Sequence, residues 1–522
     1  MLNRYVISRV LSTTGYYRYA LAALLGAILS LALPPLYIFP AASVALVFIL
    51  RMHDALNSRA SAFWLGWWFG FGHFTTGFYW ISFALLVDVA QFWWLIPFAL
   101  FGIAGIIALY LGLTFLLLYL IPARGLWKIM LFATLWTLIE MLRGLLFTGF
   151  PWNLIGSIWG FSTPMLQLAS VWGIWGLSFL TIATLTMPYM LWFSDKHPWR
   201  ACLGALAVLT SVWGLGAWRI HQNPHQAVPN IHLRIVQGNI PQTLKWDPQK
   251  EQQHLNRYIQ LSLNPGYENI THLIWPETAI PYPIQNESDS MISLLRPIIP
   301  QSGALISGAL HIEATPAGEI NRLWNAALVL PHTGNIQFYH KSHLVPFGEY
   351  IPFRNLLGDA IQKMTDGRVD FSAGEGNKTL SVPGFVPFSP LICYEAIFPN
   401  EVRDPTTAPQ VLINVTNDAW YGISSGPFQH FESTRMRAIE QGVPLIRAAN
   451  TGISGVIDPY GRIMVQSKLE TTGVLDAELP KALTSPTLYS KMGRAGIALP
   501  LILFLVFSLF KNRNRHVSIR KI

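Results

Sequence analysis

Three segments in the second half of the chain each place a reactive side chain at the end of an apolar run. LIWPET carries Glu277, YHKSHLVPFGEY carries Lys341 and Glu349, and LICYE carries Cys393. A carboxylate, an ammonium and a thiol are the groups that acyl transfer through a thioester requires. A free cysteine has a pKa of about 8.5, so a neighbouring base must take its proton at neutral pH.

The same chemistry suggests a role for each group. Glu277 is the candidate base for Cys393. Attack of the thiolate on an ester creates a tetrahedral oxyanion, which needs positive charge or N–H donors aimed at it. Lys341 is the candidate for that charge, and the backbone N–H of Tyr394 is the candidate for a second donor. Taken singly, each residue also has a plainer explanation, because buried thiols pack as small hydrophobes and charged residues often cap strand ends.

Short apolar runs bounded by turn residues predict the buried strands that would position these groups. Helical patterning appears near residues 287–297 and 428–441. Strands that alternate with helices favour a layered α/β domain, which we expect over residues 225–490. The predicted strands are 232–237, 272–275, 304–310, 324–330, 391–393 and 411–415.

The remaining sequence has the composition of a membrane protein. Of all residues, 52% are hydrophobic and only 12% are charged, which lies outside the usual globular range. A membrane-spanning helix needs roughly 20 mostly apolar residues, and about eight runs fit. We therefore expect seven spans in residues 1–218, an eighth at 495–511 and a basic cytoplasmic tail at 512–522. The eight runs lie near 18–34, 37–52, 61–84, 92–120, 127–147, 166–193, 200–218 and 495–511.

Basic residues in the short links predict the orientation, because cytoplasmic loops carry an excess of Lys and Arg. All the basic links fall on one side of the predicted spans, so we expect the domain at 225–490 to lie outside the cytoplasm. The net charge of +9 is concentrated in these links rather than on one face, which argues against a nucleic-acid partner. The residues are Arg4, Arg9, Arg51, Arg59, Arg124, Lys128, Lys196 and Arg200, with the tail.

Several chemistries lack a sequence signal. The chain has two cysteines, Cys202 in an apolar run and Cys393 in the polar half, so no disulfide framework is expected. It contains no Walker-type phosphate loop, no Cys-x-x-Cys and no His-Glu-x-x-His. We therefore expect neither a metal nor a cofactor.

The reactive segments, taken together and in this order, resemble a known superfamily. Glu277, Lys341 and Cys393, with Glu349, resemble the Glu-Lys-Cys triad of the nitrilase superfamily. The stretches LVPFGEY and ICYE, with QGNIPQTLKWD before them and NVTNDAWYG after them, resemble the apolipoprotein N-acyltransferase family in particular. The resemblance covers nearly the whole chain, because that family places a nitrilase-like α-β-β-α sandwich after seven spans and before an eighth.

The resemblance implies an activity. A fatty acyl chain would pass from a phospholipid to a cysteine thioester, and then to the α-amino group of the S-diacylglyceryl cysteine of an apolipoprotein. The enzyme would be a multi-pass protein of the bacterial inner membrane with its catalytic domain in the periplasm. Cys393 would be acylated, Glu277 would act as base, Lys341 would stabilise the oxyanion and Glu349 would orient Lys341.

The resemblance also implies further contacts. Tyr394 and Glu395 would line the pocket, and Trp246 would lie on a mobile arm over it. Arg143 and Trp152 would lie in a membrane segment that approaches the phospholipid.

Two other functions fit parts of the sequence. The first is a membrane-tethered amidase of the nitrilase type, in which water rather than an amine resolves the acyl-enzyme; eight spans are more than such an enzyme needs. The second is a transporter with a regulatory soluble domain, which the small number of charges within the spans disfavours.

Overall fold

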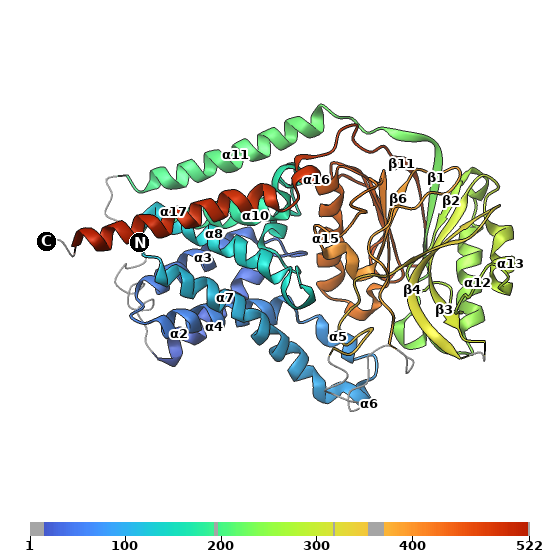
Figure 1. Cartoon of the computed structure of the whole chain (residues 1–522), viewed down its shortest axis with the longest axis horizontal. Helices are drawn as coiled ribbons and strands as arrows, with labels where there is room; N and C mark the ends of the chain where they lie inside the picture. The colour runs from blue at the N-terminus through green and yellow to red at the C-terminus, as the bar shows by residue number, and fades with distance from the viewer. Residues whose placement is uncertain (1–14, 193–196, 317–318, 353–369, 520–522) are drawn as a thin grey trace. The chain divides into compact units, whose positions relative to one another are not determined.

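The computed structural model describes residues 15–192, 197–316, 319–352 and 370–519. The chain divides into a helical unit, residues 1–82, 92–223 and 487–522, and an α/β unit, residues 83–91 and 224–486 (Figure 1). Arg4, Arg9 and Lys196, which were used to predict the orientation, lie outside the described residues, as do the last three residues of the basic tail.

In the helical unit, each of the eight predicted apolar runs contains a helix. Four helical stretches are long and apolar enough to cross a membrane among the residues described: Val89–Leu120, Gly125–Arg143, Ala169–Trp192 and Trp199–His221. A membrane domain is therefore supported, whereas the count of eight crossings stays a prediction. The main helices are α2 (Tyr16–Ser30), α3 (Phe39–Asp54), α4 (Arg59–Gly77), α7 (Ile103–Leu120), α8 (Gly125–Arg143), α10 (Ala169–Leu185), α11 (Trp199–His221) and α17 (Ala495–Ile519).

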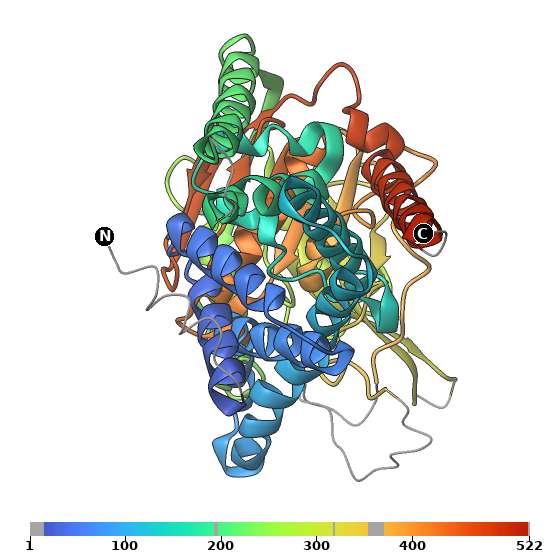
Figure 2. The same ribbon diagram turned by 90° about the vertical axis from the view of Figure 1, so that its left-hand side faces the viewer.

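Close backbone approach holds part of this unit together. Helix α4 packs against both α2 and α7. A Cβ atom on Gly26 of α2 would lie 1.9 Å from the carbonyl oxygen of Phe69, and one on Gly72 of α4 would lie 1.9 Å from that of Ala23. Small residues at such crossings are typical of helices that pack within a bilayer. Helices α11 and α17 lie on different sides of the other helices (Figure 2).

The α/β unit contains two sheets. The six-stranded sheet has the order β11-β1-β2-β3-β4-β5, and the five-stranded sheet has the order β10-β9-β8-β7-β6. Strands β1, β2 and β3 are mutually parallel, as are β6, β7 and β8, and the other pairings are antiparallel. The strands are β1 (Ala227–Gln237), β2 (His272–Ile274), β3 (Ala304–Ala314), β4 (Ile320–Pro331), β5 (Gln337–His340), β6 (Phe388–Ile392), β7 (Val411–Thr416), β8 (Leu445–Ala449), β9 (Gly455–Ile457), β10 (Ile463–Gln466) and β11 (Gly473–Pro480).

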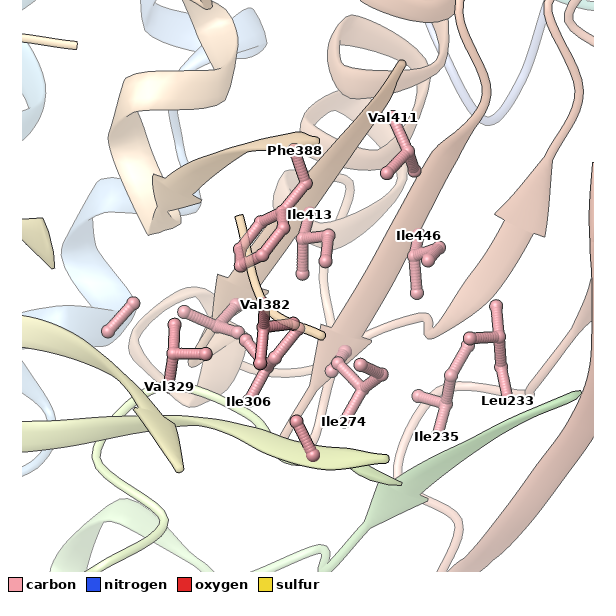
Figure 3. Close-up of a cluster of buried hydrophobic side chains, with 14 of the residues drawn as sticks. Leu233, Ile235, Ile274, Ile306, Val329, Val382, Phe388, Val411, Ile413 and Ile446 are labelled. Atoms are coloured by element: carbon pink, nitrogen blue, oxygen red, sulfur yellow. The ribbon is translucent and has the colours of Figure 1, made fainter. Parts of the chain in front are cut away.

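The main core of this unit lies between the two sheets. Ile235, Ile274 and Ile306 of the six-stranded sheet face Ile413 and Ile446 of the five-stranded sheet (Figure 3). These side chains are fully or almost fully buried. Burial of aliphatic side chains from both inner faces is what holds two packed sheets together.

Helices cover the outer face of each sheet. Leu255 of α12 (Glu251–Ser262) and Leu295 of α13 (Ser290–Leu295) pack in a second core with Leu273 of β2. Phe431 of α15 (Gly426–Gln441) packs in a third core with Leu445 of β8. The layers therefore follow the order α-β-β-α, which confirms the predicted architecture of this unit (Figure 1).

The structure differs from the sequence prediction at the ends of two predicted spans. Residues 83–91, which the sequence assigned to the end of a span and a following loop, belong to the α/β unit. The phenyl ring of Phe83 packs so closely on Gly422 that a Cβ there would lie 2.3 Å from Cδ1. Helix α17 also continues to Ile519, well into the segment expected to be a separate tail.

Candidate active site

Strand direction explains why Glu277 and Lys341 meet. Strand β5 runs parallel to β2 because it is reached from β3 by two antiparallel steps. Glu277 lies three residues after the end of β2, and Lys341 directly follows β5. The carboxyl ends of parallel strands lie at the same edge of a sheet, so both side chains emerge there.

The ammonium of Lys341 lies between two carboxylates. Its Nζ is 2.9 Å from Glu349 Oε1 and 4.0 Å from Glu277 Oε1. Lys341 is only 1% exposed. Burial alone would lower the pKa of Lys341, but Glu349 and Glu277 outweigh it and raise that pKa above its usual range. Lys341 therefore remains a cation throughout the physiological pH range.

Cys393 directly follows β6, on the sheet that faces the first two groups. Its backbone adopts φ = 51°, in the left-handed region, which costs a residue other than glycine about 1–3 kcal/mol. Burial and then the Glu277 carboxylate raise the pKa of the Cys393 thiol to about 12, although Lys341 lowers it. The thiol is therefore protonated at rest, and it lies within the electrostatic field of both partners.

Asn325 joins the two carboxylates, and sequence reasoning missed it. Its Nδ2 donates to Glu277 Oε1 at 2.8 Å and to Glu349 Oε1 at 2.9 Å. Its carbonyl oxygen accepts from the backbone N–H of Lys341 at 2.9 Å. Strand β4 thus fixes all three charged residues through one side chain and one peptide group.

The second oxygen of Glu277 is held by a different sheet. The backbone N–H of Asn417, just after β7, donates to Glu277 Oε2 at 2.9 Å. The side chain of Asn417 donates to Gln242 Oε1 at 2.7 Å. Gln242 also lines a cavity of about 320 Å³ within the α/β unit. Glu277, the candidate base, is therefore held by hydrogen bonds from both sheets. Asn417 links it to Gln242 in the wall of this cavity.

Glu395 holds the backbone around the site. Its Oε1 accepts from Tyr339 Oη and from the backbone N–H groups of Ser342 and His343, and its Oε2 accepts from the N–H of Ile392. The sequence predicted a pocket-lining role for Glu395 and Tyr394. Both oxygens of Glu395 are occupied in joining the Lys341 loop to the Cys393 turn, so its carboxylate acts on the site through the backbone. Tyr394 is buried in that turn, the 3-10 helix Cys393–Ile397.

A buried polar network lies behind the thiol. His430 Nε2 is 3.2 Å from the carbonyl oxygen of Cys393, and Asn414 Nδ2 is 3.5 Å from it. Arg447 Nη2 is 2.6 Å from Asp418 Oδ2 and 3.0 Å from His430 Nδ1. Burial and the Arg447 guanidinium lower the pKa of His430, whereas Asp418, whose Oδ1 is 2.9 Å from Nδ1, partly opposes this. Because a carbonyl oxygen only accepts, we place the hydrogen on Nε2, which donates to Cys393.

The turn after the 3-10 helix Gln242–Leu244 brings a second lysine to the site. Lys245 is 6% exposed, and its Nζ donates to the backbone carbonyl oxygen of Glu277 at 3.0 Å. Trp246, the residue that the sequence singled out here, is half-buried in the same turn. The reactive side chain that this turn adds to the cluster is therefore Lys245.

Arg143 and Trp152 form a cluster of their own in the helical unit. Arg143 Nη1 donates to the carbonyl oxygens of Phe150 and Trp152, both at 2.8 Å. Trp152 is 1% exposed, and its ring centroid is 4.5 Å from that of Trp80. These contacts fix the segment after α8, and a lipid contact stays a prediction.

Two family comparisons cover both units. Residues 232–489 match the carbon-nitrogen hydrolase family, and residues 25–187 match the N-terminal domain of apolipoprotein N-acyltransferase.

Full-length relatives agree with these matches. The chain is 38% identical to apolipoprotein N-acyltransferase of Rhodopseudomonas palustris, over 98% of this chain and 99% of the relative. It is 38% identical to the enzyme of the same name from Rickettsia prowazekii, over 92% and 96%. Among solved structures, an amidase mutant from Nesterenkonia sp. AN1 aligns with a TM-score of 0.35 and 19% identity, over 51% of this chain and 97% of the amidase.

The contacts of Asn325 predict a large effect of its loss. Replacing it in Asn325→Leu leaves the Glu277 and Glu349 carboxylates without their shared donor. We expect kcat/KM in an acyl-transfer assay to fall about 10- to 100-fold, the scale of hydrogen bonds to charged groups. The control is Asn256→Leu, because Asn256 lies exposed on α12 and bonds only Gln252 among the described residues. An Asn325→Leu enzyme as active as the control would contradict the bridging role.

The network behind the thiol gives a separate prediction. His430→Leu removes one donor to the Cys393 carbonyl, so the left-handed backbone loses support, and kcat should fall about three- to tenfold with KM unchanged. His430→Gln retains an N–H donor and should recover most of kcat. His272→Leu is the control, since His272 is equally buried but lies outside this network. Equal kcat in the Leu and Gln variants would show that the donor is irrelevant.

Proposed function

The chain belongs to the apolipoprotein N-acyltransferase family, and we propose that it transfers a fatty acyl chain from a phospholipid to the α-amino group of a diacylglyceryl apolipoprotein, through a thioester on Cys393. As a member of this family it is an acyltransferase that N-acylates lipoproteins in the bacterial inner membrane. The phospholipid donor, the thioester and the residue roles are our proposal.

In the first half-reaction, Glu277 takes the thiol proton as the Cys393 sulfur attacks the ester carbonyl carbon of the phospholipid. The resulting oxyanion receives positive charge from Lys341 and an N–H from Tyr394. The carbon–oxygen bond of the ester then breaks, and the leaving alkoxide takes the proton from Glu277. The products are the acyl-thioester and a lysophospholipid.

In the second half-reaction, the neutral α-amine of the apolipoprotein attacks the thioester carbonyl carbon. Glu277 accepts the proton that the amine loses, and the carbon–sulfur bond breaks. The Cys393 thiolate then takes the proton from Glu277, so the enzyme returns to its starting state. No ATP is needed, because the bond energy of the phospholipid ester supports both steps.

One observation supports this proposal above the others. The buried thiol of Cys393 is protonated, and it interacts electrostatically with Glu277 and Lys341. Glu277 accepts a hydrogen bond from the backbone of Asn417, on the other sheet, and lies 4.0 Å from the ammonium of Lys341. Those groups suit proton removal and oxyanion stabilisation in a site with little water. Glu349, 2.9 Å from Lys341, keeps the ammonium charged and in place.

The proposed nucleophile is tested with the acceptor withheld. Purified enzyme in micelles of defined phospholipid should gain the mass of one acyl chain on Cys393, and neutral hydroxylamine should remove it. Cys393→Ser and Cys393→Ala should lose acyl transfer to a diacylglyceryl lipopeptide, whereas Cys202→Ser, the other cysteine, should retain it. Full transfer by Cys393→Ala would refute the assignment.

The same assay separates the proposal from its alternative. With both substrates present, an acyltransferase forms N-acyl lipopeptide. A membrane-tethered amidase would instead release free fatty acid at the same rate with or without the lipopeptide, and that result would replace our proposal.

We also propose eight spans, with the α/β unit outside the cytoplasm. In a Cys202→Ser, Cys393→Ala background, Ser288→Cys on the exposed surface of the α/β unit should react with a membrane-impermeant maleimide in intact spheroplasts. Arg124→Cys, in the link before α8, should react only after permeabilisation. The opposite pattern would reverse the orientation.

A further inference from the structure

Lys245 is a buried cation with few partners. An ammonium has three N–H donors. Among the described residues, Lys245 has one hydrogen-bond acceptor, the Glu277 carbonyl oxygen, and no carboxylate pairs with it. Burying a charge with so little compensation is costly, so such a residue is seldom retained for stability alone.

The charges around Lys245 suggest what it does. Glu277 and Glu349 contribute two negative charges, and Lys341 contributes one positive charge. Without Lys245 this cluster carries a net negative charge, which opposes a further anion on Cys393. With Lys245 the cluster is neutral, so a thiolate that forms on Cys393 meets one more positive charge than it would without Lys245.

We propose that Lys245 is a positioning residue of the active site, whose buried ammonium holds Glu277 through its backbone carbonyl and balances the two carboxylates so that Cys393 ionises. The inference rests on the proposed roles of Cys393 and Glu277. It deepens them by adding a second cation, from the segment before α12, to the Glu-Lys-Cys set.

The pKa of Lys245 and of the titratable groups near it decides at which pH its charge can be tested. Burial lowers the pKa of Lys245 to about 8, although Glu277 and Cys393 partly oppose this. Lys245 is therefore a cation below about pH 8 and neutral above it. On its own segment and on α12 lie Asp247, Lys250, His254 and Arg257. Burial lowers the pKa of His254, so it is uncharged from neutral pH upwards and does not change the comparison.

The test measures how readily Cys393 ionises, without any acyl donor. Full-length enzyme carrying Cys202→Ser, so that one thiol remains, is alkylated with iodoacetamide between about pH 6 and about pH 10, and the rate is followed by intact mass. Lys245→Met removes the charge but keeps a similar length, and Lys245→Arg keeps the charge. Lys250→Met is the matched control, since Lys250 is a more exposed lysine of the same segment.

We expect Lys245→Met to react about tenfold more slowly than the parent at pH 7, a shift of about one pKa unit. Lys245→Arg and Lys250→Met should stay close to the parent at that pH. Above about pH 8 the parent loses its own ammonium, so its advantage over Lys245→Met should disappear. Lys245→Arg remains charged and should then react faster than the parent.

Three results would overturn the inference: equal rates for Lys245→Met and the parent at pH 7, a Lys245→Arg enzyme as slow as Lys245→Met, or a gap that stays constant over the whole pH range. A parallel incubation of the parent with phospholipid alone separates the two proposals. If no thioester forms on Cys393, the proposed function fails. If it forms while the alkylation rates of parent and Lys245→Met are equal, only the role of Lys245 fails.

Discussion

Lys341 lies between two carboxylates where water hardly reaches, its ammonium 2.9 Å from Glu349 and 4.0 Å from Glu277. A buried ion is stable only when its partners are held in good geometry and their remaining atoms are satisfied. The surrounding structure meets that condition. Asn325 donates to both carboxylates, and the backbone of Asn417 donates to the second oxygen of Glu277. Loss of any one support leaves a buried charge without its partner, so these contacts depend on one another.

The two facing sheets together supply the groups that make those contacts. The acid and the ammonium come from one sheet, and the thiol and Asn417 come from the other. The aliphatic core between the sheets keeps the two sets of strand ends in register. Cys393 also needs support from behind, because its left-handed backbone is unfavourable. His430 and Asn414 provide it, so the network behind the thiol and the cluster in front of it act on the same residue.

The sequence predicted β1, β2, β3, β4, β6 and β7 from apolar runs that are bounded by turns. It missed β9, and it missed β5, the strand that leads to Lys341. It missed β8 because that strand places the buried Arg447 in its middle, and it missed β10 and β11 because their outer positions are polar and partly exposed. Asn325 and His430 could not be predicted, since only the fold brings them to the site. The sequence could have pointed to Lys245 as a site residue, because it directly precedes Trp246. A lysine in a polar turn, however, is usually expected at the surface. Helices α2 and α3 have 15 and 16 residues, so their length alone does not show that they cross a bilayer.

Exclusion of water has a consequence for the proposed reaction. A thioester is open to attack by water as well as by an amine, so an acyltransferase must favour the amine. Glu277, Lys341 and Cys393 are each less than 8% exposed, and both oxygens of Glu277 already accept hydrogen bonds from protein. An amine that is delivered by a bound lipid chain gains the advantage of proximity over water. Low access of water to these groups and delivery of the amine by a bound lipid would together favour aminolysis over hydrolysis in the proposed reaction.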